Sequence, residues 1–275
     1  MQLDSKVNRS GLVATYIGGP TALFKWDGLR LLTDPTFDPA GTNYVLNLYT
    51  LKKREGPAIP PEKLGHIDAV LLSHDHHFDN LDRAGRALLT SADKVLTTEI
   101  GAQRLGGKAI GLTRWQSVEI PGRDGRKLRI TATPARHGPV GGDRGPVVGF
   151  VLNFTDAPDD CLYISGDTVW FDDLEEVARR FTVTTAVLFM GAAIVPRVGP
   201  AHLTMTAEER RVRREGFPQC QDCAAALFGL GAFYGITRRC SKRVYQSVPA
   251  DPLVLAGAGS GKDVSVSAHR TAAGA

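Results

Sequence analysis

The chain has 275 residues, of which 43% are hydrophobic, and this is enough apolar material for the core of one large domain or two small ones. Its first residues, MQLDSKVNRSG, lack the apolar core of a secretion signal. No segment reaches the roughly 18 consecutive apolar residues that a membrane-spanning helix needs. We therefore expect a soluble, cytoplasmic protein without a membrane span.

The net charge of +4 is unevenly distributed along the chain. Residues 210–275 contain ten Lys and Arg against four Asp and Glu, a net charge of +6, whereas residues 1–209 contain 23 against 25, a net charge of −2. This mildly acidic body argues against a nucleic-acid partner. The alternative, nucleic-acid binding by the basic end, predicts an affinity that falls steeply with salt and disappears when residues 210–275 are deleted.

The first predicted elements are short β-strands at residues 12–18, 21–26 and 29–35. Gly, Pro and Asp-Gly turns separate these apolar runs, which favours an antiparallel meander. Residues 67–73, IDAVLLS, form a continuous apolar run typical of a buried strand. Residues 82–92, DRAGRALLTSA, have the spacing of a helix.

Strands continue through the middle of the chain, with one predicted helix between the last two of them. The helix is expected at residues 171–181, FDDLEEVARRF. The strands are expected at residues 94–98, 117–121, 127–135, 147–154, 161–167 and 184–191. This order, strands first and then strands mixed with helices, fits two packed sheets with helices on their outer faces.

Residues 71–82, LLSHDHHFDNLD, place three histidines and three aspartates directly after a predicted strand. His74 and His76 flank Asp75, and this spacing on a turn lets both imidazoles reach one cation. Zinc accepts neutral imidazole and carboxylate ligands, and catalytic zinc sites keep one position for water. Further donors follow at His77, Asp79 and Asn80. The loop therefore predicts a metal site; the alternative is a polar loop whose histidines cap the next helix.

Two later residues also follow predicted strands, so they would lie at the same rim. They are His137 in TATPARHGPV and Asp167 in LYISGDTVW. Each alone is more typical of an ordinary loop residue than of a metal ligand. Together with the histidine-rich loop they make a series of metal-binding side chains at strand ends.

The order of these motifs resembles the metallo-β-lactamase superfamily: a strand, a His-x-His loop, a later histidine and then SGDT. The opening YIGGPTALFKWDGLRLLTDPTFDP and the LLSHDHHFDNLD loop are similar to its ascorbate-6-phosphate lactonase-like branch, over about residues 11–209. The resemblance implies a four-layer αβ/βα sandwich with a metal site at one edge of its two sheets. It implies that His74, His76 and His137 hold a first metal, which Asp167 bridges to a second.

The sequence departs from the family pattern at the second metal. The family's run is His-x-His-x-Asp-His, whereas here one residue is added and the run ends in Asp79 and Asn80. Asp79 can bind through its carboxylate, Asn80 is a poor replacement for imidazole, and His77 is expected either to replace the missing ligand or to support another. Asp34 and Asp68 are candidates for orienting metal-bound histidines; turn and strand-start roles are the alternative.

These residues predict a metal-dependent hydrolase. A bound cation lowers the pKa of water from about 15.7 to about 7 and polarises the scissile group, so no serine or cysteine nucleophile is needed. Asp79 and Asp167 are the expected catalytic residues. Zinc, as one or two ions, is the expected cofactor, with manganese or iron as alternatives. The expected substrate is a small-molecule ester, lactone, amide or phosphoester, and the sequence does not indicate the oligomeric state.

Residues 41–66 are predicted to be a loop that shapes the substrate site. Its aromatic and basic side chains either favour an anionic substrate or form a solvated face. They are Tyr44, Tyr49, Lys52, Lys53 and Arg54.

The resemblance stops after residues 202–209, HLTMTAEE. The family closes its site with one more histidine after the last strand, and the only remaining histidines here that follow Asp167 are His202 and His269. His202 is a possible part of a site loop, with a surface role as the alternative. His269 lies in a segment predicted to be disordered.

The segment after Glu209 is atypical in charge, cysteine content and periodicity. Reading the codons from Glu215 one base later permits the peptide KAFPNAKIVPLHFSGWAHFTESR, which contains the kind of histidine loop that the family places there. A frameshift near Glu209 would explain these features together. We therefore expect a metallo-β-lactamase-like domain at residues 1–209, incomplete at its C-terminal part, and an out-of-frame tail at residues 210–275. The alternative function is an impaired remnant that binds one metal or none.

Overall fold

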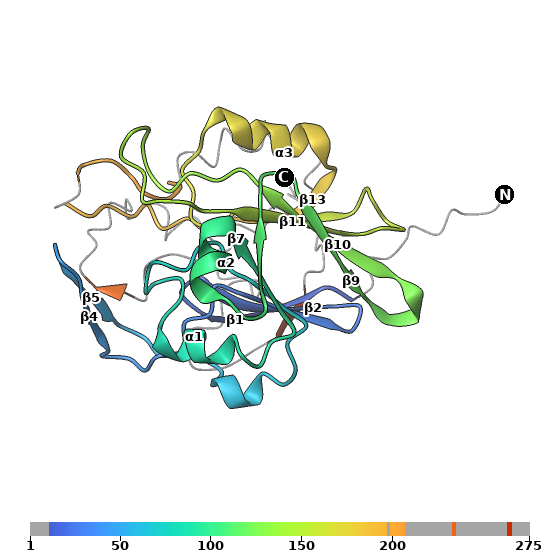
Figure 1. Cartoon of the computed structure of the whole chain (residues 1–275), viewed down its shortest axis with the longest axis horizontal. Helices are drawn as coiled ribbons and strands as arrows, with labels where there is room; N and C mark the ends of the chain where they lie inside the picture. The colour runs from blue at the N-terminus through green and yellow to red at the C-terminus, as the bar shows by residue number, and fades with distance from the viewer. Residues whose placement is uncertain (1–10, 197–198, 207–232, 235–262, 266–275) are drawn as a thin grey trace, which may run out of the picture.

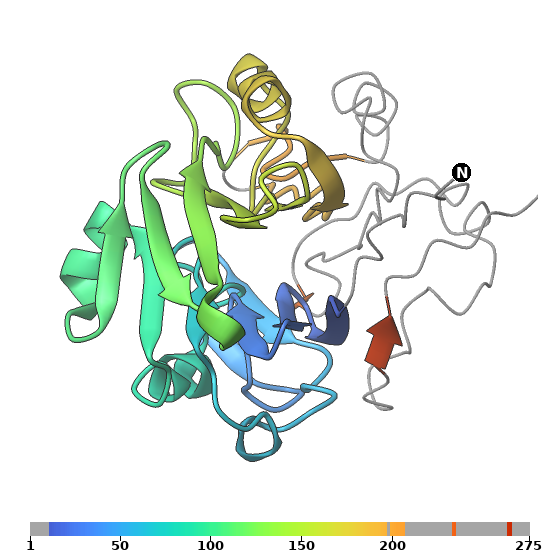
Figure 2. The same cartoon turned by 90° about the vertical axis from the view of Figure 1, so that its right-hand side faces the viewer.

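Two β-sheets face each other with the main hydrophobic core between them (Figure 1). The computed structural model describes residues 11–196, 199–206, 233–234 and 263–265. Helices lie on the outer faces of the sheets, so the layers run helix, sheet, sheet, helix (Figures 1 and 2). The expected four-layer αβ/βα sandwich is confirmed.

The first sheet contains seven strands within the described residues, in the spatial order β15, β1, β2, β3, β6, β7 and β8. Their bounds are Val13–Gly18 (β1), Thr21–Trp26 (β2), Leu29–Thr33 (β3), Ala69–Leu71 (β6), Lys94–Thr98 (β7), Ala109–Leu112 (β8) and Asp263–Ser265 (β15). β1, β2 and β3 pair antiparallel, as the predicted meander requires. β3, β6, β7 and β8 run parallel, so their carboxyl ends share one edge.

The second sheet has the order β13, β12, β11, β10, β9 in the described part of the chain. Its strands are Ser117–Pro121 (β9), Lys127–Thr133 (β10), Gly149–Phe154 (β11), Cys161–Ile164 (β12) and Val183–Val187 (β13). β11 is antiparallel to both β10 and β12. β10 and β12 therefore point the same way and end at the same edge of the sheet.

A small third sheet contains a hairpin that the sequence had suggested was a loop. It consists of β4 (Asn43–Val45), β5 (Thr50–Lys53) and β14 (Phe233–Tyr234). Tyr44 and Leu51 are buried on its inner face, whereas their strand neighbours are exposed, as period-two alternation requires. These strands have three and four residues, which is too short for a clear periodic signal in the sequence.

The core between the two main sheets is built from their inward-facing apolar side chains. Phe24, Leu31 and Leu96 of the first sheet pack in one cluster with Phe150 and Ile164 of the second. Each such side chain contributes about 1.5–3 kcal/mol when it is fully buried. This packing fixes the two sheets relative to each other and so fixes the edge at which their strand ends meet.

Three short α-helices and three 3-10 turns complete the described chain. They are α1 (Arg83–Leu88), α2 (Glu99–Leu105), α3 (Glu175–Arg180), and turns at Pro61–Lys63, Arg123–Gly125 and Asp172–Leu174. Leu88 of α1 packs on the outer face of the first sheet, and Val177 of α3 on that of the second. In the described residues, no helix is both long and apolar enough to cross a bilayer.

The helix predictions were correct in place but not in extent. α1 begins after its predicted start because Asp82 is the N-cap and accepts the Gly85 N–H, and it ends before residue 92. α2 was not predicted. It begins directly after β7, with Thr98 as N-cap, and its one buried residue is Gly101, so it carries no apolar stripe in the sequence.

Candidate metal centre

Strand ends from both main sheets meet at one edge of the sandwich. β6 leads into residues 72–82, which we name the histidine loop; β10 leads to His137 and β12 to Asp167. The Val148 N–H donates to the Ser73 carbonyl at 3.0 Å, which ties the second sheet to the start of the histidine loop. The rim expected from the sequence is thus shared by two sheets.

The ring of His74 is fully buried and is oriented by a chain of polar groups. Asp34, which follows β3, accepts the Ser73 N–H at 2.6 Å and the Ser73 hydroxyl at 2.9 Å. The Ser73 oxygen lies 2.9 Å from His74 Nδ1. Because its own proton goes to Asp34, this oxygen accepts the His74 Nδ1–H, and His74 Nε2 keeps its lone pair. Asp34 thus acts on His74 through Ser73.

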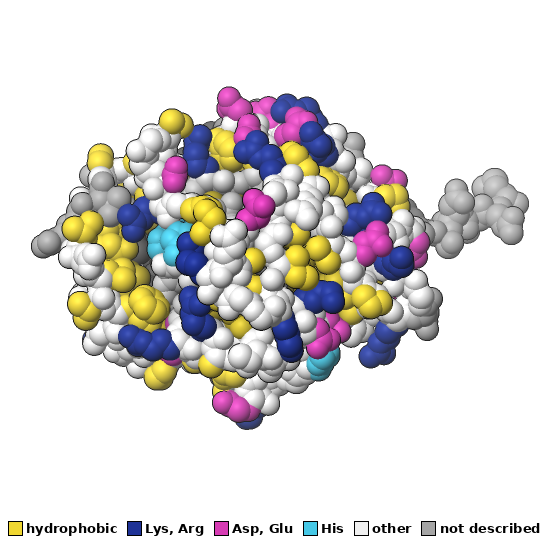
Figure 3. Space-filling view, in the orientation of Figure 1, with side chains coloured by type: hydrophobic (Ala, Val, Ile, Leu, Met, Phe, Trp, Pro, Cys, Tyr) yellow, Lys and Arg dark blue, Asp and Glu magenta, His cyan; other side chains and the backbone are white. Residues whose placement is uncertain are grey.

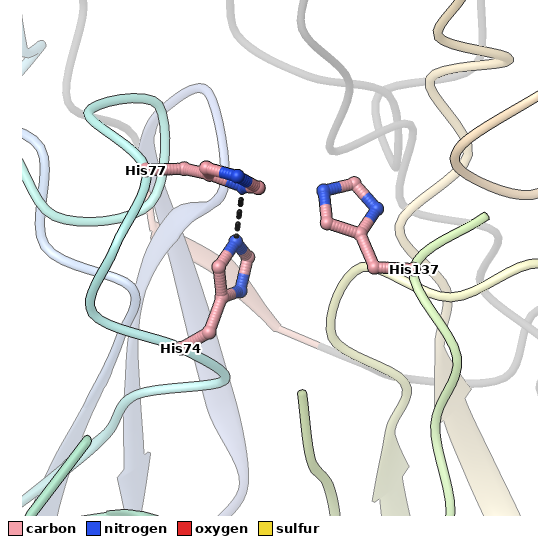
Figure 4. Close-up of side chains that lie close together, drawn as sticks. All are labelled: His74, His77 and His137. Carbon is pink, nitrogen blue, oxygen red and sulfur yellow. Dashed lines mark hydrogen bonds between the residues drawn. The ribbon is translucent and has the colours of Figure 1, made fainter. Parts of the chain in front are cut away.

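Three histidines bring their ring nitrogens together at the rim (Figure 4). One ring nitrogen from each of His74, His77 and His137 lies within 4.8 Å of the others. His74 Nε2 and His77 Nδ1 are 2.9 Å apart. His137 faces them from the opposite side, so the group draws on both sheets (Figure 4).

His76 lies beside this group, but its outer nitrogen is directed elsewhere. Its Nε2 donates to the Arg144 carbonyl at 2.7 Å, although its ring centroid is only 4.3 Å from that of His77. The resemblance assigned His76, not His77, to the first metal, and the structure instead places His77 with His74 and His137. Which of the two imidazoles binds a metal therefore stays a prediction.

His137 is buried and is oriented by a backbone carbonyl. Its Nδ1 donates to the Leu203 carbonyl at 2.7 Å, so its Nε2 keeps a lone pair. This Nε2 lies 3.7 Å from Asp167 Oδ2. The close approach of the strands needs glycine at 166, where φ is +60° and an added Cβ would lie 2.8 Å from the Ser73 side chain.

Two buried carboxyl groups complete the donor set. Burial raises the pKa of Asp79 to about 7, with a further contribution from the Asp167 charge. Burial likewise raises the pKa of Asp167 to about 7, against the lowering effect of a hydrogen bond with Asn80. Two buried acidic groups that interact electrostatically are destabilising as a pair of anions, unless a cation lies near them.

The metal that the fold implies fits these residues. Burial, together with the neighbouring imidazoles, lowers the pKa values of His74 and His77 well below the usual range, so both rings are neutral at pH 7. Burial also lowers the pKa of His137. Neutral imidazoles and carboxylates are the ligands that zinc and related cations prefer. The site thus contains neutral imidazoles that can donate electron pairs to a cation, together with two acidic side chains whose negative charge a cation would balance.

Other residues singled out in the sequence have different positions. Asn80 Nδ2 donates to Asp34 at 3.3 Å, while its buried Oδ1 has no hydrogen-bond partner among the described residues. Asp68 accepts the Arg30 N–H at 2.7 Å at the far end of β6, so it orients none of the clustered histidines. His202 lies near the Ala192 carbonyl, outside the group. His269 lies outside the described residues, and so does the proposed frameshift segment except for Phe233–Tyr234 (β14) and Asp263–Ser265 (β15).

Sequence reasoning missed two ion pairs that hold the histidine loop. Asp75, inside the His-x-His motif, is buried and paired with Arg104 of α2. Asp82, at the end of the histidine loop, accepts a hydrogen bond from the buried Lys53 ammonium at 2.8 Å. Such pairs join residues far apart in sequence, and no local pattern marks them.

The hairpin also contacts the histidine loop through aromatic rings. Tyr44 stacks on Phe78 with ring centroids 4.6 Å apart, and the Tyr44 hydroxyl donates to Asp38 at 2.8 Å. Phe78 lies between His77 and Asp79 in the chain. The hairpin therefore supports the part of the loop that carries two of the metal-binding groups.

The site opens to the surface in a hollow. Figure 3 shows a histidine in this hollow with Lys or Arg side chains beside it and hydrophobic side chains toward the β4–β5 hairpin. His76, beside the group, is exposed and His77 is partly exposed, whereas His74 and His137 are buried. A small molecule can thus approach the cluster from this face of the molecule (Figure 3).

Fold and site together define a class: αβ/βα sandwich proteins with a metal-binding edge formed by strand ends of both sheets. Residues 29–216 match the family model described as the beta-lactamase superfamily domain. The match covers well over half of the chain, which therefore belongs to this superfamily.

Proteins of related sequence carry the hydrolase designation. A UPF0173 metal-dependent hydrolase of Pyrobaculum aerophilum is 26% identical over 203 residues, which cover 72% of this chain and 80% of the relative. N-acyl-phosphatidylethanolamine-hydrolyzing phospholipase D 1 of Caenorhabditis elegans is 30% identical over 123 residues, or 44% of this chain and 31% of the relative. The predicted class, a metal-dependent hydrolase, is confirmed at this level.

Solved structures support the fold. The isothiocyanate hydrolase from Delia radicum gut bacteria superposes with a TM-score of 0.62 at 24% identity, covering 76% of this chain and 82% of its own. A possible metal-dependent hydrolase from Veillonella parvula gives a TM-score of 0.61 at 20% identity, covering 78% and 84%. Both similarities concern the fold alone.

Proposed function

We propose that this protein hydrolyses an ester, lactone, amide or phosphoester of a small molecule with a metal-activated water, and that the metal is zinc, as one or two ions. The observation that carries the proposal is the group of His74, His77 and His137. The Asp167 carboxylate lies 3.7 Å from His137, and the buried Asp79 carboxyl interacts electrostatically with both. Imidazole and carboxylate donors suit zinc, with manganese and iron as the alternatives.

The chain's own residues would hold and orient the reacting groups. His74, His77 and His137 would be the imidazole ligands, and the Ser73 hydroxyl and Leu203 carbonyl fix the first and last of these rings. When bound, the cation lowers the pKa of a water toward about 7 and polarises the scissile group. The fixed rings reduce the reorganisation that binding and reaction require.

Asp79 and Asp167 are the groups best placed to hold or move a proton. A carboxyl group with a pKa of about 7 exchanges its proton readily at neutral pH, which suits a general acid or base. We assign both carboxyls to metal binding, and Asp79 in addition to proton transfer with the leaving group. The water nucleophile then needs no serine or cysteine.

The similarity of the opening strands and the histidine loop to the ascorbate-6-phosphate lactonase-like branch supports a lactone or ester substrate. The names of the relatives cover an isothiocyanate hydrolase and a phospholipase D, so this fold accommodates several scissile bonds. A panel of p-nitrophenyl esters, lactones and bis-p-nitrophenyl phosphate would therefore be the first assay.

The test combines metal content with activity. Purified protein should bind zinc, lose hydrolysis on chelation and regain it when zinc is restored. His74→Ala should lose both properties. A protein that binds zinc but hydrolyses none of the panel would refute the proposed substrate class, and one that binds no divalent cation would refute the function.

A second candidate is an impaired remnant that binds one metal or none. Asn80 favours it, because this residue stands where the family pattern has a histidine and already donates to Asp34. We further propose that residues 1–209 form the domain and that residues 210–275 are read out of frame. The family match ends at residue 216, close to this boundary.

Sequencing the gene from codon 200 to its stop codon tests this second candidate. A gained or lost base near codon 209 would mean that hydrolysis must be assayed on the corrected chain. If the written frame is right, a zinc stoichiometry of two per chain would favour the enzyme, whereas one or none would favour the remnant.

A further inference from the structure

Arg144 is fixed beside the metal centre by its own main chain. Its N–H donates to the His137 carbonyl at 2.7 Å, and its carbonyl accepts the His76 Nε2–H at 2.7 Å. The next residue, Gly145, has φ +97°, and an added Cβ there would lie 3.0 Å from His76 Nε2. This segment is thus packed closely against the histidines and holds Arg144 at the site.

The Arg144 side chain is directed toward the same site. It hydrogen-bonds Tyr49, the guanidinium being the donor and the phenol oxygen the acceptor, and its charge acts on Asp79, His77 and His137. Within the described residues, Arg144 forms no ion pair of its own.

Tyr49 is itself positioned by two hydrophobic clusters. It is half-buried and packs against Tyr44 and Leu51 of the hairpin on one side and against Val195 and Leu203 on the other. Tyr49 is therefore held in place and can orient the Arg144 guanidinium.

A fixed positive charge beside a cation site is unfavourable for the cation. Arg144 is joined through its main chain to His137 and His76, so its positive charge lies near the cation site and would repel a bound metal. A bound anion would relieve this repulsion, and arginine is the side chain best suited to carboxylate and phosphate geometry.

We propose that Arg144 and Tyr49 form an anion-binding subsite next to the metal centre, so that the substrate carries a carboxylate or phosphate group. The inference rests on the proposed function, since it assigns one part of that substrate. The proposal also distinguishes Arg144 from Lys53, one of the basic residues expected to favour an anionic substrate, because the Lys53 ammonium already forms a buried ion pair with Asp82.

The test measures two affinities in each variant by isothermal titration calorimetry: zinc, and then inorganic phosphate or acetate with the zinc-loaded and the metal-free protein. The variants are Arg144→Ala and Tyr49→Phe. Arg114→Ala is the matched control, because this arginine pairs with Asp173 at an exposed position.

The expected result has opposite signs for the two ligands. Arg144→Ala should weaken phosphate or acetate binding by about tenfold or more, while zinc binds equally well or more tightly. Tyr49→Phe should weaken the anion less, and Arg114→Ala should change neither affinity. The preferred anion, phosphate or acetate, identifies the substrate group.

Two results would overturn the proposal. One is an unchanged anion affinity in Arg144→Ala; the other is a parallel loss of zinc and anion binding, which indicates a structural role. Failure of every variant and the parent to bind zinc would instead contradict the proposed function, and Arg144-dependent phosphate binding by the metal-free protein would still support the subsite.

Discussion

Two groups of side chains of the types that bind metals lie at opposite ends of the same strands. His74, His77 and His137 gather beyond the carboxyl end of β6, whereas His66, Asp68 and Asp93 precede β6 and β7. In each group the ligand atoms lie within 4.8 Å of one another. By distance alone the two groups are equivalent.

The two groups differ in burial and in what holds their members. His74 is 0% exposed and His137 3%, and each has its Nδ1 committed to an orienting partner. The His66 side chain is 59% exposed and that of Asp93 54%, so water solvates both. Exposed charged groups gain little free energy from pairing, and they lose side-chain conformational entropy when they come together. Proximity of donors therefore does not make a metal site; fixed and desolvated donors do.

The largest expected effect tests this contrast directly. His74→Ala and His137→Ala should each weaken zinc binding by about 100-fold or more, because each removes a pre-oriented ligand. His66→Ala should leave the affinity unchanged. Competition with a chromophoric chelator measures all three. Zinc retained by either buried-site variant would contradict the ligand assignment.

The next effect sharpens the assignment within the histidine loop. His77→Ala should weaken zinc binding by about tenfold to 100-fold, whereas His76→Ala should weaken it less, because the His76 Nε2–H is donated to the Arg144 carbonyl. The same competition assay applies. The reverse order would show that the pattern implied by the family resemblance prevails when metal is bound.

A smaller effect concerns the support of the loop by the hairpin. Tyr44→Leu removes the ring that stacks on Phe78, and zinc affinity should fall by about tenfold, as for other groups that orient ligands. Tyr44→Phe keeps the ring and should change zinc affinity much less.

The control for Tyr44 is Tyr163→Leu, which truncates another fully buried tyrosine in the second sheet. Both leucine variants should lose about 1–3 kcal/mol of unfolding free energy, measured by urea denaturation. Equal losses of zinc affinity in both would mean that the Tyr44 effect is only a loss of stability.

The smallest expected effect is the pH dependence. Asp79 and Asp167, each with a pKa of about 7, are mainly ionised above this pH and take up protons below it. Zinc must displace these protons, so its affinity should fall as the pH is lowered from about 8 to about 6. Chelator competition at fixed ionic strength measures the slope. An affinity that is independent of pH in this range would exclude both carboxyls as ligands.

The sequence by itself determined the fold class and most of the residues of the site. Continuous apolar runs followed by His74, His137 and Asp167 fixed which strands end at the functional edge, since these signals are local. The strands at residues 21–26 and 29–35 were predicted from apolar runs between turns. α2 was missed because it carries no apolar stripe, and the β4–β5 hairpin because its strands are too short for a periodic signal.

Tertiary structure alone decided which imidazole joins the cluster and how the cluster is held. The placement of His77, and the pairs of Asp75 with Arg104 and Asp82 with Lys53, depend on where separate segments pack. The shifted pKa values of Asp79 and Asp167 have the same origin, since burial is a property of the folded chain. Local sequence patterns identify the candidate metal ligands, whereas packing in three dimensions sets the distances between them, their hydrogen-bond partners and their ionisation.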